Sequence, residues 1–427
     1  MSDAVVLYPY LKNQPTGSRS PDACLAEAVA LTGAIDLNII YSESIALREI
    51  KANAYLGKGT LDRLAPIASE ADVVIMACPL SPLQQRNLEK KWKTKVIDKT
   101  ALILEIFGQR ARTREGVLQV ELAHLTYARS RLVRSWTHLE RQRGGSGFLG
   151  GPGETQIELD RRLLDDDIVK IKKELAEVKK TRELHRKARR RVPYPIVALV
   201  GYTNAGKSTL FNRLTQANVM AKDMLFATLD PTMRQIRLPH GTEVILSDTV
   251  GFISDLPTEL VMAFRATLEE VLEADIIVHV RDYSHPDTEA QKQDVEAVLS
   301  DLGVKDKVDK GLIEVLNKID LLPADEQKRI WTQKNRYSNE WPVSALTGQG
   351  IDDFLSRIEQ ELMKDQEIVE LSIPIDRGDL LASLYRKGQV LSRRDNTKTI
   401  SLTVSLPPKD YHLFQPYQKS QNRPTRK

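Results

Sequence analysis

Apolar and polar positions along the first 110 residues predict short buried strands separated by helices. Three apolar runs are typical of strands covered on both faces: residues 4–8, 35–40 and 73–77. Residues 25–31 and 61–68, between them, have the apolar spacing of helices. Strands that alternate with helices favour a small parallel sheet. We therefore predict an N-terminal α/β domain over residues 1–113.

From residue 114 the apolar positions follow the three- and four-residue steps of long helices. Two series of such positions are separated by one break: Leu118, Leu122, Leu125, Leu132, Trp136 and Leu139 in the first, and Leu164, Ile168, Ile171, Leu175 and Val178 in the second. Residues 144–153, between the two series, contain six glycines and cannot continue a helix. We predict an antiparallel coiled-coil hairpin over residues 114–192, with a glycine-rich tip loop at 144–153.

A third pattern begins after Pro193 and Pro195. Apolar runs that predict strands recur at residues 196–200, 244–246, 276–280 and 312–316, with helical spacing between them. This order predicts a doubly wound α/β domain over residues 193–365. The alternating run at 399–404 predicts a small α+β domain within residues 366–427, which end in a polar tail.

The composition favours a folded chain of several domains. With 427 residues, 41% of them hydrophobic and 28% charged, the chain can bury several cores. No run approaches about 18 apolar residues and the N-terminus lacks the pattern of a secretory signal, so we expect neither a membrane span nor secretion. Cys24 and Cys78 are too few for a disulfide framework or a zinc site. We expect a cytoplasmic monomer, with a peripheral location at a membrane left open.

One segment carries a complete phosphate-binding pattern. The pattern G-x-x-x-x-G-K-[ST] is formed by Gly201, Tyr202, Thr203, Asn204, Ala205, Gly206, Lys207 and Ser208. It follows the predicted strand 196–200 and precedes a helical run at 209–214, which is the context that a phosphate loop requires. Lys207 would bridge the β- and γ-phosphates, and the Ser208 hydroxyl would bind Mg²⁺.

A second segment predicts that the bound base is guanine. Asn317, Lys318, Ile319 and Asp320 follow the predicted strand 312–316. A carboxylate at Asp320 can accept hydrogen bonds from both N1–H and N2–H₂ of guanine, which would favour guanine over adenine about 10²- to 10⁴-fold. Asn317 would hold the neighbouring loop. Ser344, Ala345 and Leu346 would present backbone N–H groups to the guanine O6.

Two further segments predict a switch that responds to the γ-phosphate. Asp248, Thr249, Val250 and Gly251 follow the predicted strand 244–246; Asp248 would hold a water on Mg²⁺, and the Gly251 N–H would contact the γ-phosphate. Phe226, Ala227, Thr228, Leu229 and Asp230 lie between this segment and the phosphate loop. Thr228 is the expected second hydroxyl on Mg²⁺, with Thr232 as the alternative. Segments that become ordered only with a γ-phosphate form a switch.

The predicted catalytic residues are Lys207, Thr228, Asp248 and Gly251. Phe252 stands where many GTPases place a glutamine that orients the attacking water, so we expect slow intrinsic turnover, with water positioned by another group or by a partner. Asn204 occupies the loop position where potassium-stimulated GTPases carry an asparagine ligand. Its role as a K⁺ ligand and a simple role as a hydrogen-bonding loop residue both remain open.

Several long strings resemble the HflX family, ribosome-associated GTPases of the phosphate-loop, translation-factor-like superfamily (Obg–HflX). The resemblance runs through most of residues 45–365, and the strings that carry it lie at 57–59, 102–111, 118–122, 151–156 and 226–232. It implies GTP hydrolysis coupled to binding of the large ribosomal subunit and to splitting of stalled ribosomes. Many members carry an arginine just before the string Gly-Pro-Gly-Glu, where this chain has residues 148–151 without one.

The charge distribution points to the same kind of partner. The total charge is +4, but residues 110–192 carry +9 and the remainder carries −5. We expect the basic hairpin 110–192 to contact the large ribosomal subunit and its RNA through phosphates. The alternative explanation of this positive charge is that the lysines and arginines only form the solvent-exposed face of a coiled coil. At the level of function, the alternatives are a GTP-tuned RNA-binding or remodelling factor, a large-subunit assembly factor, and a coiled-coil scaffold that regulates a protein partner.

Overall fold

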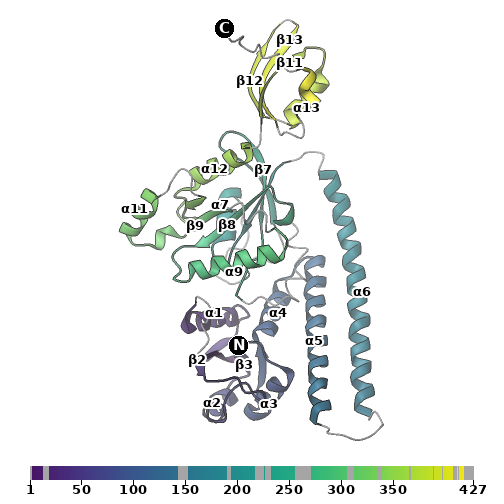
Figure 1. Ribbon diagram of the computed structural model, residues 1–427, viewed down its shortest axis with the longest axis vertical. Helices are drawn as coiled ribbons and strands as arrows, with labels where there is room; N and C mark the ends of the chain where they lie inside the picture. The colour runs from purple at the N-terminus through teal and green to yellow at the C-terminus, as the bar shows by residue number, and fades with distance from the viewer. Residues whose placement is uncertain are drawn as a thin grey trace, which may run out of the picture.

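A computed structural model describes residues 2–12, 19–142, 152–189, 194–216, 226, 232–254, 271–304, 312–333, 339–364, 367–387, 389–396, 398–406, 411 and 413–417. The chain forms an N-terminal α/β unit, a pair of long helices, a larger α/β unit and a small C-terminal sheet (Figure 1). The prediction of an α/β chain with several domains is confirmed. No helix in the part of the chain that the structure describes is long and apolar enough to span a membrane.

The N-terminal unit is built on a four-stranded parallel sheet with strand order β2-β1-β3-β4. Its elements are β1 (Asp3–Leu11), α1 (Pro21–Gly33), β2 (Asn38–Leu47), α2 (Lys58–Glu70), β3 (Val73–Met76), α3 (Pro82–Trp92), β4 (Lys95–Asp98) and α4 (Lys99–Arg110). The side chains of Ser20, Ser81 and Asp98 accept hydrogen bonds from the first turns of α1, α3 and α4, which explains where these helices begin.

Two details of this unit differ from the predictions. The strand expected at residues 35–40 begins only at Asn38 and continues to Leu47, because Asp36 adopts a left-handed turn conformation with φ +57°. As an edge strand, β2 alternates in burial, and the apolar run alone therefore misplaced it. The four-residue strand β4 was not predicted, since its apolar content is limited to Val96 and Ile97.

The long helices α5 (Arg114–Gln142) and α6 (Pro152–Arg189) lie side by side (Figure 1). Leu118, Ile168 and Ile171 are buried at positions expected to face the partner helix. Arg129 pairs with Asp165 of the facing helix at 2.9 Å. The last two residues of the predicted tip, 152 and 153, are helical, since α6 already begins at Pro152, a residue suited to the first helical position. Residues 144–151 of the predicted tip lie outside the described residues.

The larger α/β unit has a six-stranded sheet with order β10-β9-β8-β5-β7-β6. Its strands are β5 (Ile196–Val200), β6 (Thr232–Arg237), β7 (Glu243–Asp248), β8 (Ile276–Asp282), β9 (Ile313–Asn317) and β10 (Glu340–Pro342). Only β6, at the edge, is antiparallel to its neighbour, so the described sheet is mixed. The described helices are α7 (Lys207–Thr215), α9 (Thr288–Asp301), η1 (Ile319–Leu321), α11 (Ala324–Gln333) and α12 (Ile351–Met363).

The C-terminal unit is a three-stranded antiparallel sheet of β11 (Glu367–Pro374), β13 (Thr399–Leu406) and β12 (Gln389–Asp395), in that order. The helix α13 (Gly378–Lys387) contributes the buried Leu384 to its core, and η2 (Gln415–Tyr417) ends the described chain. The run predicted as a strand at 399–404 lies within β13.

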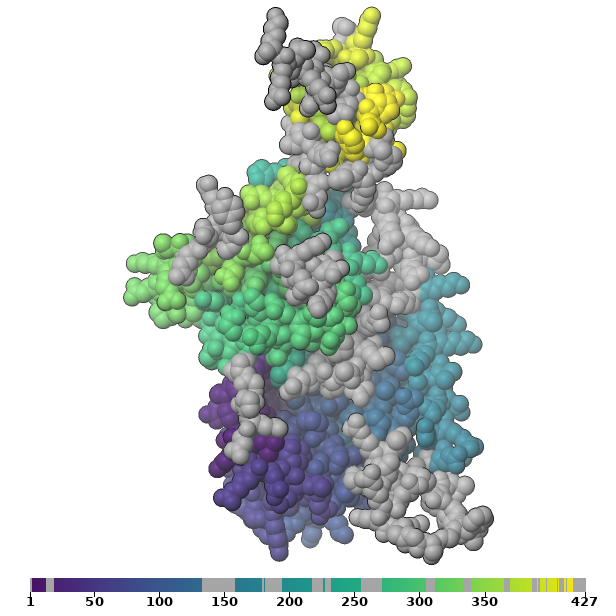
Figure 2. Space-filling model, in the orientation of Figure 1, coloured from purple at the N-terminus to yellow at the C-terminus, as the bar shows by residue number. Residues whose placement is uncertain are grey.

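The two α/β units share one hydrophobic core. Residues of α4, such as Ile103 and Phe107, belong to the same buried cluster as Phe226, Phe252 and Val271 of the larger unit. The rings of Phe107 and Phe226 meet edge to face, with centroids 4.6 Å apart. The units are stacked along the long axis of the molecule, with the C-terminal unit at the far end (Figure 2).

Candidate nucleotide site

The predicted phosphate loop forms the turn between β5 and α7, at the carboxyl end of the central strand. Gly201 has φ +151°, and a Cβ there would lie 2.1 Å from the Val280 carbonyl oxygen. Gly206 has φ +91°, and a Cβ there would lie 2.2 Å from Nδ2 of Asn317. These two positions therefore require glycine for both conformation and space.

Lys207 lies at the start of α7 and is only 6% exposed. Its ammonium group donates to the backbone oxygens of Gly201 at 3.1 Å and Tyr202 at 2.7 Å. Burial lowers the pKa of Lys207 to about 8, against the opposing effect of the Asp248 carboxylate. The loop thus holds the buried ammonium group of Lys207 beside its own backbone. A positive charge in this position suits the negatively charged phosphates of a nucleotide.

Ser208 and Asp248 lie together at this end of the sheet. The Ser208 hydroxyl donates to Oδ2 of Asp248 at 2.7 Å, and Asp248 is fully buried at the end of β7. A hydroxyl and a carboxylate oxygen at one point are the hard ligands that Mg²⁺ prefers. These residues therefore fit the metal that the sequence predicted.

The segment after Asp248 is paired with the phosphate loop. Thr203 donates its backbone N–H to the Phe252 carbonyl at 2.7 Å, and Phe252 donates to the Gly201 carbonyl at 3.1 Å. A Cβ on Gly251 would lie 2.8 Å from Cγ2 of Thr203 and 3.1 Å from Nζ of Lys207. The close packing of Gly251 places its backbone directly against the loop.

Other side chains of this segment face away from the loop. The Thr249 hydroxyl donates to the Leu199 carbonyl at 2.6 Å, and Val250 is buried in the shared core. Phe252 is 2% exposed and lies in the same core. Its ring is therefore a packing group.

Asn317 connects the phosphate loop to the segment expected to contact guanine. Its side-chain Nδ2 donates to the Ala205 carbonyl at 2.9 Å, and its Oδ1 accepts from the Ala345 N–H at 3.0 Å. Ser344 is buried and accepts from the Thr347 N–H, whereas Leu346 is exposed. The structure thus brings the loop and residues 344–346 together through one side chain.

The other residues of this motif have different environments. Asp320 lies in η1 and is partly exposed, while Ile319 is fully buried in front of it. Lys318 has φ +63°, and its Nζ lies 2.8 Å from Oδ2 of Asp282. The left-handed turn at Lys318 precedes two residues in different environments, since Ile319 is buried and Asp320 is partly exposed.

The first predicted switch segment is described only in part. Ala227, Thr228, Leu229 and Asp230 lie outside the described residues. Phe226, which the sequence placed among the nucleotide contacts, is 1% exposed and packs on Phe107 of α4. The structure therefore assigns its side chain to the shared core.

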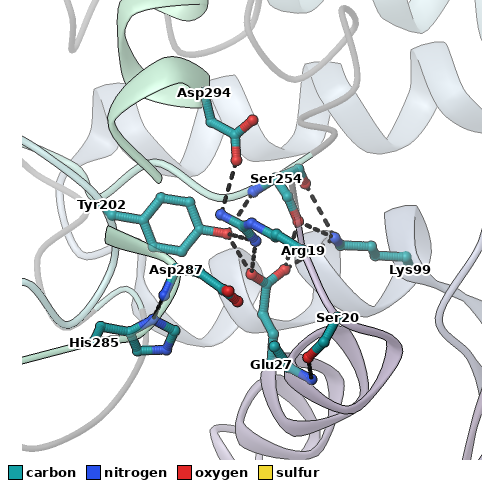
Figure 3. Close-up of polar contacts among 10 residues, drawn as sticks. Arg19, Ser20, Glu27, Lys99, Tyr202, Ser254, His285, Asp287 and Asp294 are labelled. Atoms are coloured by element: carbon teal, nitrogen blue, oxygen red, sulfur yellow. Dashed lines mark hydrogen bonds and ion pairs between the residues drawn. The ribbon is translucent and has the colours of Figure 1, made fainter. Parts of the chain in front are cut away.

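A polar cluster that the sequence did not indicate joins the N-terminal unit to this site (Figure 3). Its members are Arg19, Glu27, Lys99, Tyr202, Ser254 and Asp294. Tyr202 belongs to the phosphate loop, and Ser254 is three residues beyond Gly251. No local motif signals this cluster, because its members are far apart in the sequence.

Comparison with known proteins agrees with this architecture. Residues 22–108 match the family model described as "GTP-binding GTPase N-terminal", and residues 110–189 match "GTP-binding GTPase Middle Region". Residues 196–318 match "50S ribosome-binding GTPase", and residues 329–414 match "HflX C-terminal domain". These matches and the loop geometry define the class as a phosphate-loop GTPase with flanking units.

Relatives that match most of the chain define the family. The chain is 48% identical over 392 residues to "GTPase HflX" of Magnetococcus marinus, covering 91% of this chain and 89% of that protein. It is 45% identical to "GTPase HflX" of Escherichia coli, with 84% and 83% covered, and 37% identical to "Putative GTP-binding protein 6" of Xenopus laevis, with 86% and 70% covered. The chain belongs to the HflX family of GTPases. The predictions of this family and of a GTP hydrolase are confirmed.

Proposed function

We propose that the chain uses its GTP cycle to bind the large ribosomal subunit and to split or rescue stalled ribosomes. The observation that carries this proposal is the match of residues 196–318 to a family described as a 50S ribosome-binding GTPase. The phosphate loop supports it, because Lys207, Ser208 and Asp248 meet at the end of the sheet where such nucleotides bind.

The proposed phosphate contacts follow from this geometry. The backbone N–H groups of residues 201–208 and the N-terminus of α7 surround the phosphates, and Lys207 exchanges its two carbonyl partners for β- and γ-phosphate oxygens. The Gly251 N–H contacts the γ-phosphate. Ser208 and Thr228 are the proposed ligands of Mg²⁺, with Asp248 accepting from a metal-bound water. The metal would neutralise phosphate charge.

The proposed guanine contacts lie on the other side of Asn317. Asp320 accepts from the guanine ring, and the backbone of residues 344–346 meets its O6. Because Asn317 is hydrogen-bonded to Ala205 and Ala345, base recognition and phosphate binding share one rigid connection. Loss of the Asn317 side chain would therefore weaken both contacts together.

Slow hydrolysis by the isolated chain follows from the position of Phe252. Its ring is buried in the shared core and carries no group that could orient water. We propose that the ribosome supplies or arranges the group that positions the attacking water. Asn204 is exposed at φ +61° on the loop, where a K⁺ ion bound beside the phosphates would add positive charge to the transition state.

The hairpin is the proposed ribosomal contact. Six basic side chains are exposed along the described part of α6: Arg161, Arg162, Lys170, Lys172, Lys173 and Lys180. Contacts between such side chains and RNA phosphates release counterions, so binding should weaken steeply with salt. A GTP-tuned RNA-binding factor, or a factor for large-subunit assembly, remains the second candidate, since its charge requirements are the same.

Multiple-turnover GTP hydrolysis with and without purified large subunits tests the proposal. We expect stimulation of roughly tenfold or more, greater in KCl than in NaCl, and conversion of whole ribosomes to subunits on a sucrose gradient. A variant lacking residues 145–151 should retain GTP binding and lose the stimulation. RNA binding without stimulation would favour the second candidate, and neither response would refute both.

A further inference from the structure

The N-terminal unit holds the segment after Gly251 through one buried carboxylate. The Ser254 hydroxyl donates to Oε1 of Glu27 at 2.7 Å, and Lys99 donates to the same oxygen at 3.0 Å. The ammonium group of Lys99 also donates to the Ser254 hydroxyl at 2.9 Å and to its carbonyl at 3.1 Å. Ser254 is therefore fixed by two residues from α1 and α4 (Figure 3).

The second oxygen of Glu27 is engaged with the phosphate loop. The Tyr202 hydroxyl donates to Oε2 of Glu27, and Arg19 donates to Oε2 and to the Tyr202 oxygen, each at 2.8 Å. The Ser254 N–H also donates to the Tyr202 oxygen at 2.8 Å. The guanidinium of Arg19 lies 4.8 Å from the centre of the Tyr202 ring and reaches Asp294 in α9. One carboxylate thus connects the loop and the segment that follows Gly251.

The charges in this cluster are held away from water. Only 12% of the Glu27 side chain and 9% of the Arg19 side chain are exposed. Burial alone would raise the pKa of Glu27, but Lys99, the hydrogen bonds from Tyr202 and Ser254, and Arg19 together bring it below its usual value. Glu27 is therefore ionised near neutral pH and strongly oriented by its partners.

The same helix of the N-terminal unit contacts the first residue of one predicted switch segment and a residue three positions beyond the other. Lys99 begins α4 and contacts Ser254, while Phe107, two turns further along, packs on Phe226. Phe226 directly precedes residues 227–230 in the sequence. A shift of α4 relative to the phosphate loop would therefore displace Phe226 and Ser254 together.

We infer that Glu27 is a positioning residue that, with Arg19 and Lys99, holds the segment 251–254 against the phosphate loop and so favours GTP over GDP. This inference rests on the proposed contact between the Gly251 N–H and the γ-phosphate and is independent of the ribosomal role. GDP lacks the γ-phosphate, so its binding does not depend on where Gly251 lies. By thermodynamic linkage, GTP in turn strengthens the contact between the two α/β units.

The test compares the affinities of the full chain for a non-hydrolysable GTP analogue and for GDP, with Mg²⁺ and without ribosomes. In Glu27→Gln, which keeps the size of the side chain but removes its charge, we expect roughly 5- to 10-fold weaker binding of the analogue and GDP binding within about twofold of wild type. Glu70→Gln, an exposed position on α2 of the same unit, is the matched control and should change neither affinity.

Substitutions at Lys99 provide a second and independent arm. Lys99→Met should reproduce the selective loss, and Lys99→Arg, which restores a cation, should recover most of it. An equal loss of both nucleotides, no change in either, or tighter binding of the analogue would each overturn the inference. A wild-type chain that does not bind the analogue would instead refute the nucleotide site itself.

Discussion

The N-terminal unit contacts the rest of the chain at two polar junctions, each built from an arginine, a tyrosine and a carboxylate. At one, Arg19 stacks on Tyr202 and both bind Glu27; at the other, Arg131 lies 5.2 Å from the Tyr127 ring centre and both bind Asp98. The first junction faces the phosphate loop and the second faces helix α5. The two junctions use the same types of side chain, but the other hydrogen bonds made to their carboxylates differ.

Asp98 accepts hydrogen bonds from backbone groups of its own unit in addition to those from α5. Its carboxylate accepts from the Ala101 N–H at 2.9 Å, where it begins α4, and from the Leu80 N–H at 3.4 Å. Tyr127 then donates to it at 2.8 Å and Arg131 at 3.2 Å. Only 3% of the Asp98 side chain is exposed. This junction fixes helix α5 to the N-terminal unit.

Glu27 has no comparable backbone support among the contacts that the structure describes. Its partners are side chains, and two of them, Tyr202 and Ser254, belong to the phosphate loop and to the segment 251–254. Side chains can exchange partners more readily than a helix can exchange its N-cap. From this difference we expect the Asp98 junction to stay fixed and the Glu27 junction to respond to the nucleotide, as inferred above.

The largest effect is expected at the Asp98 junction. Asp98→Ala removes the acceptor of two backbone N–H groups and leaves Arg131 without its carboxylate partner, so the free energy of unfolding should fall by about 3–5 kcal/mol. Urea unfolding monitored by circular dichroism measures this change. Asp98→Asn, which keeps one acceptor oxygen, should lose less. If the free energy of unfolding fell by less than about 1 kcal/mol, or if the preference for GTP over GDP changed, the two junctions would not differ as described.

The two tyrosines provide a matched pair of intermediate effect. Tyr127→Phe and Tyr202→Phe each remove a hydrogen bond to a buried carboxylate, and each should lower the free energy of unfolding by roughly 1.5–3 kcal/mol. Only Tyr202→Phe should also weaken binding of a GTP analogue relative to GDP. Parallel urea titrations and nucleotide titrations separate the two outcomes. If both variants shifted nucleotide preference equally, the junctions would not differ in function.

The smallest effect is expected from pH. The partners of Glu27 hold its pKa below the ordinary value of 4.5, so its carboxylate stabilises the fold above about pH 4.5 and this contribution is lost as pH falls through the folded pKa. The stability difference between wild type and Glu27→Gln should therefore be full from pH 7 down to about pH 4.5 and shrink as the pH falls further. Thermal unfolding of both proteins across this range measures it. A difference that grew at lower pH would contradict the assigned role of the carboxylate.

Local motifs explain how much of the nucleotide site was predictable. Gly201, Gly206 and Lys207 were recognisable because a tight turn between strand and helix requires these residue types at fixed spacing. The fold class was predictable for a similar reason, since buried strands and long helices differ in apolar period. The start of β2 and the start of α6 were misplaced, because a turn at Asp36 and a proline suited to a first helical turn leave only weak local signals.

Contacts between distant segments were not predictable from one sequence. Phe226 lay in a string expected to meet the nucleotide, but the structure packs its ring on Phe107, 119 positions earlier in the sequence. Glu27 lies 175 positions from Tyr202 and 227 from Ser254. No periodicity or spacing rule relates residues so far apart, since only the packing of α1 and α4 against the larger unit brings them together.

The sequence by itself determined the phosphate loop, the alternation of strands and helices, and the concentration of positive charge in residues 110–192, because each depends on residue types at short range. Only the tertiary structure decided which side chains of the N-terminal unit contact the phosphate loop and which contact helix α5. Two α/β units must share a core before a carboxylate on one can be buried against the other. Because it is buried there, Glu27, an ordinary helical residue in the sequence, connects the N-terminal unit to the larger α/β unit.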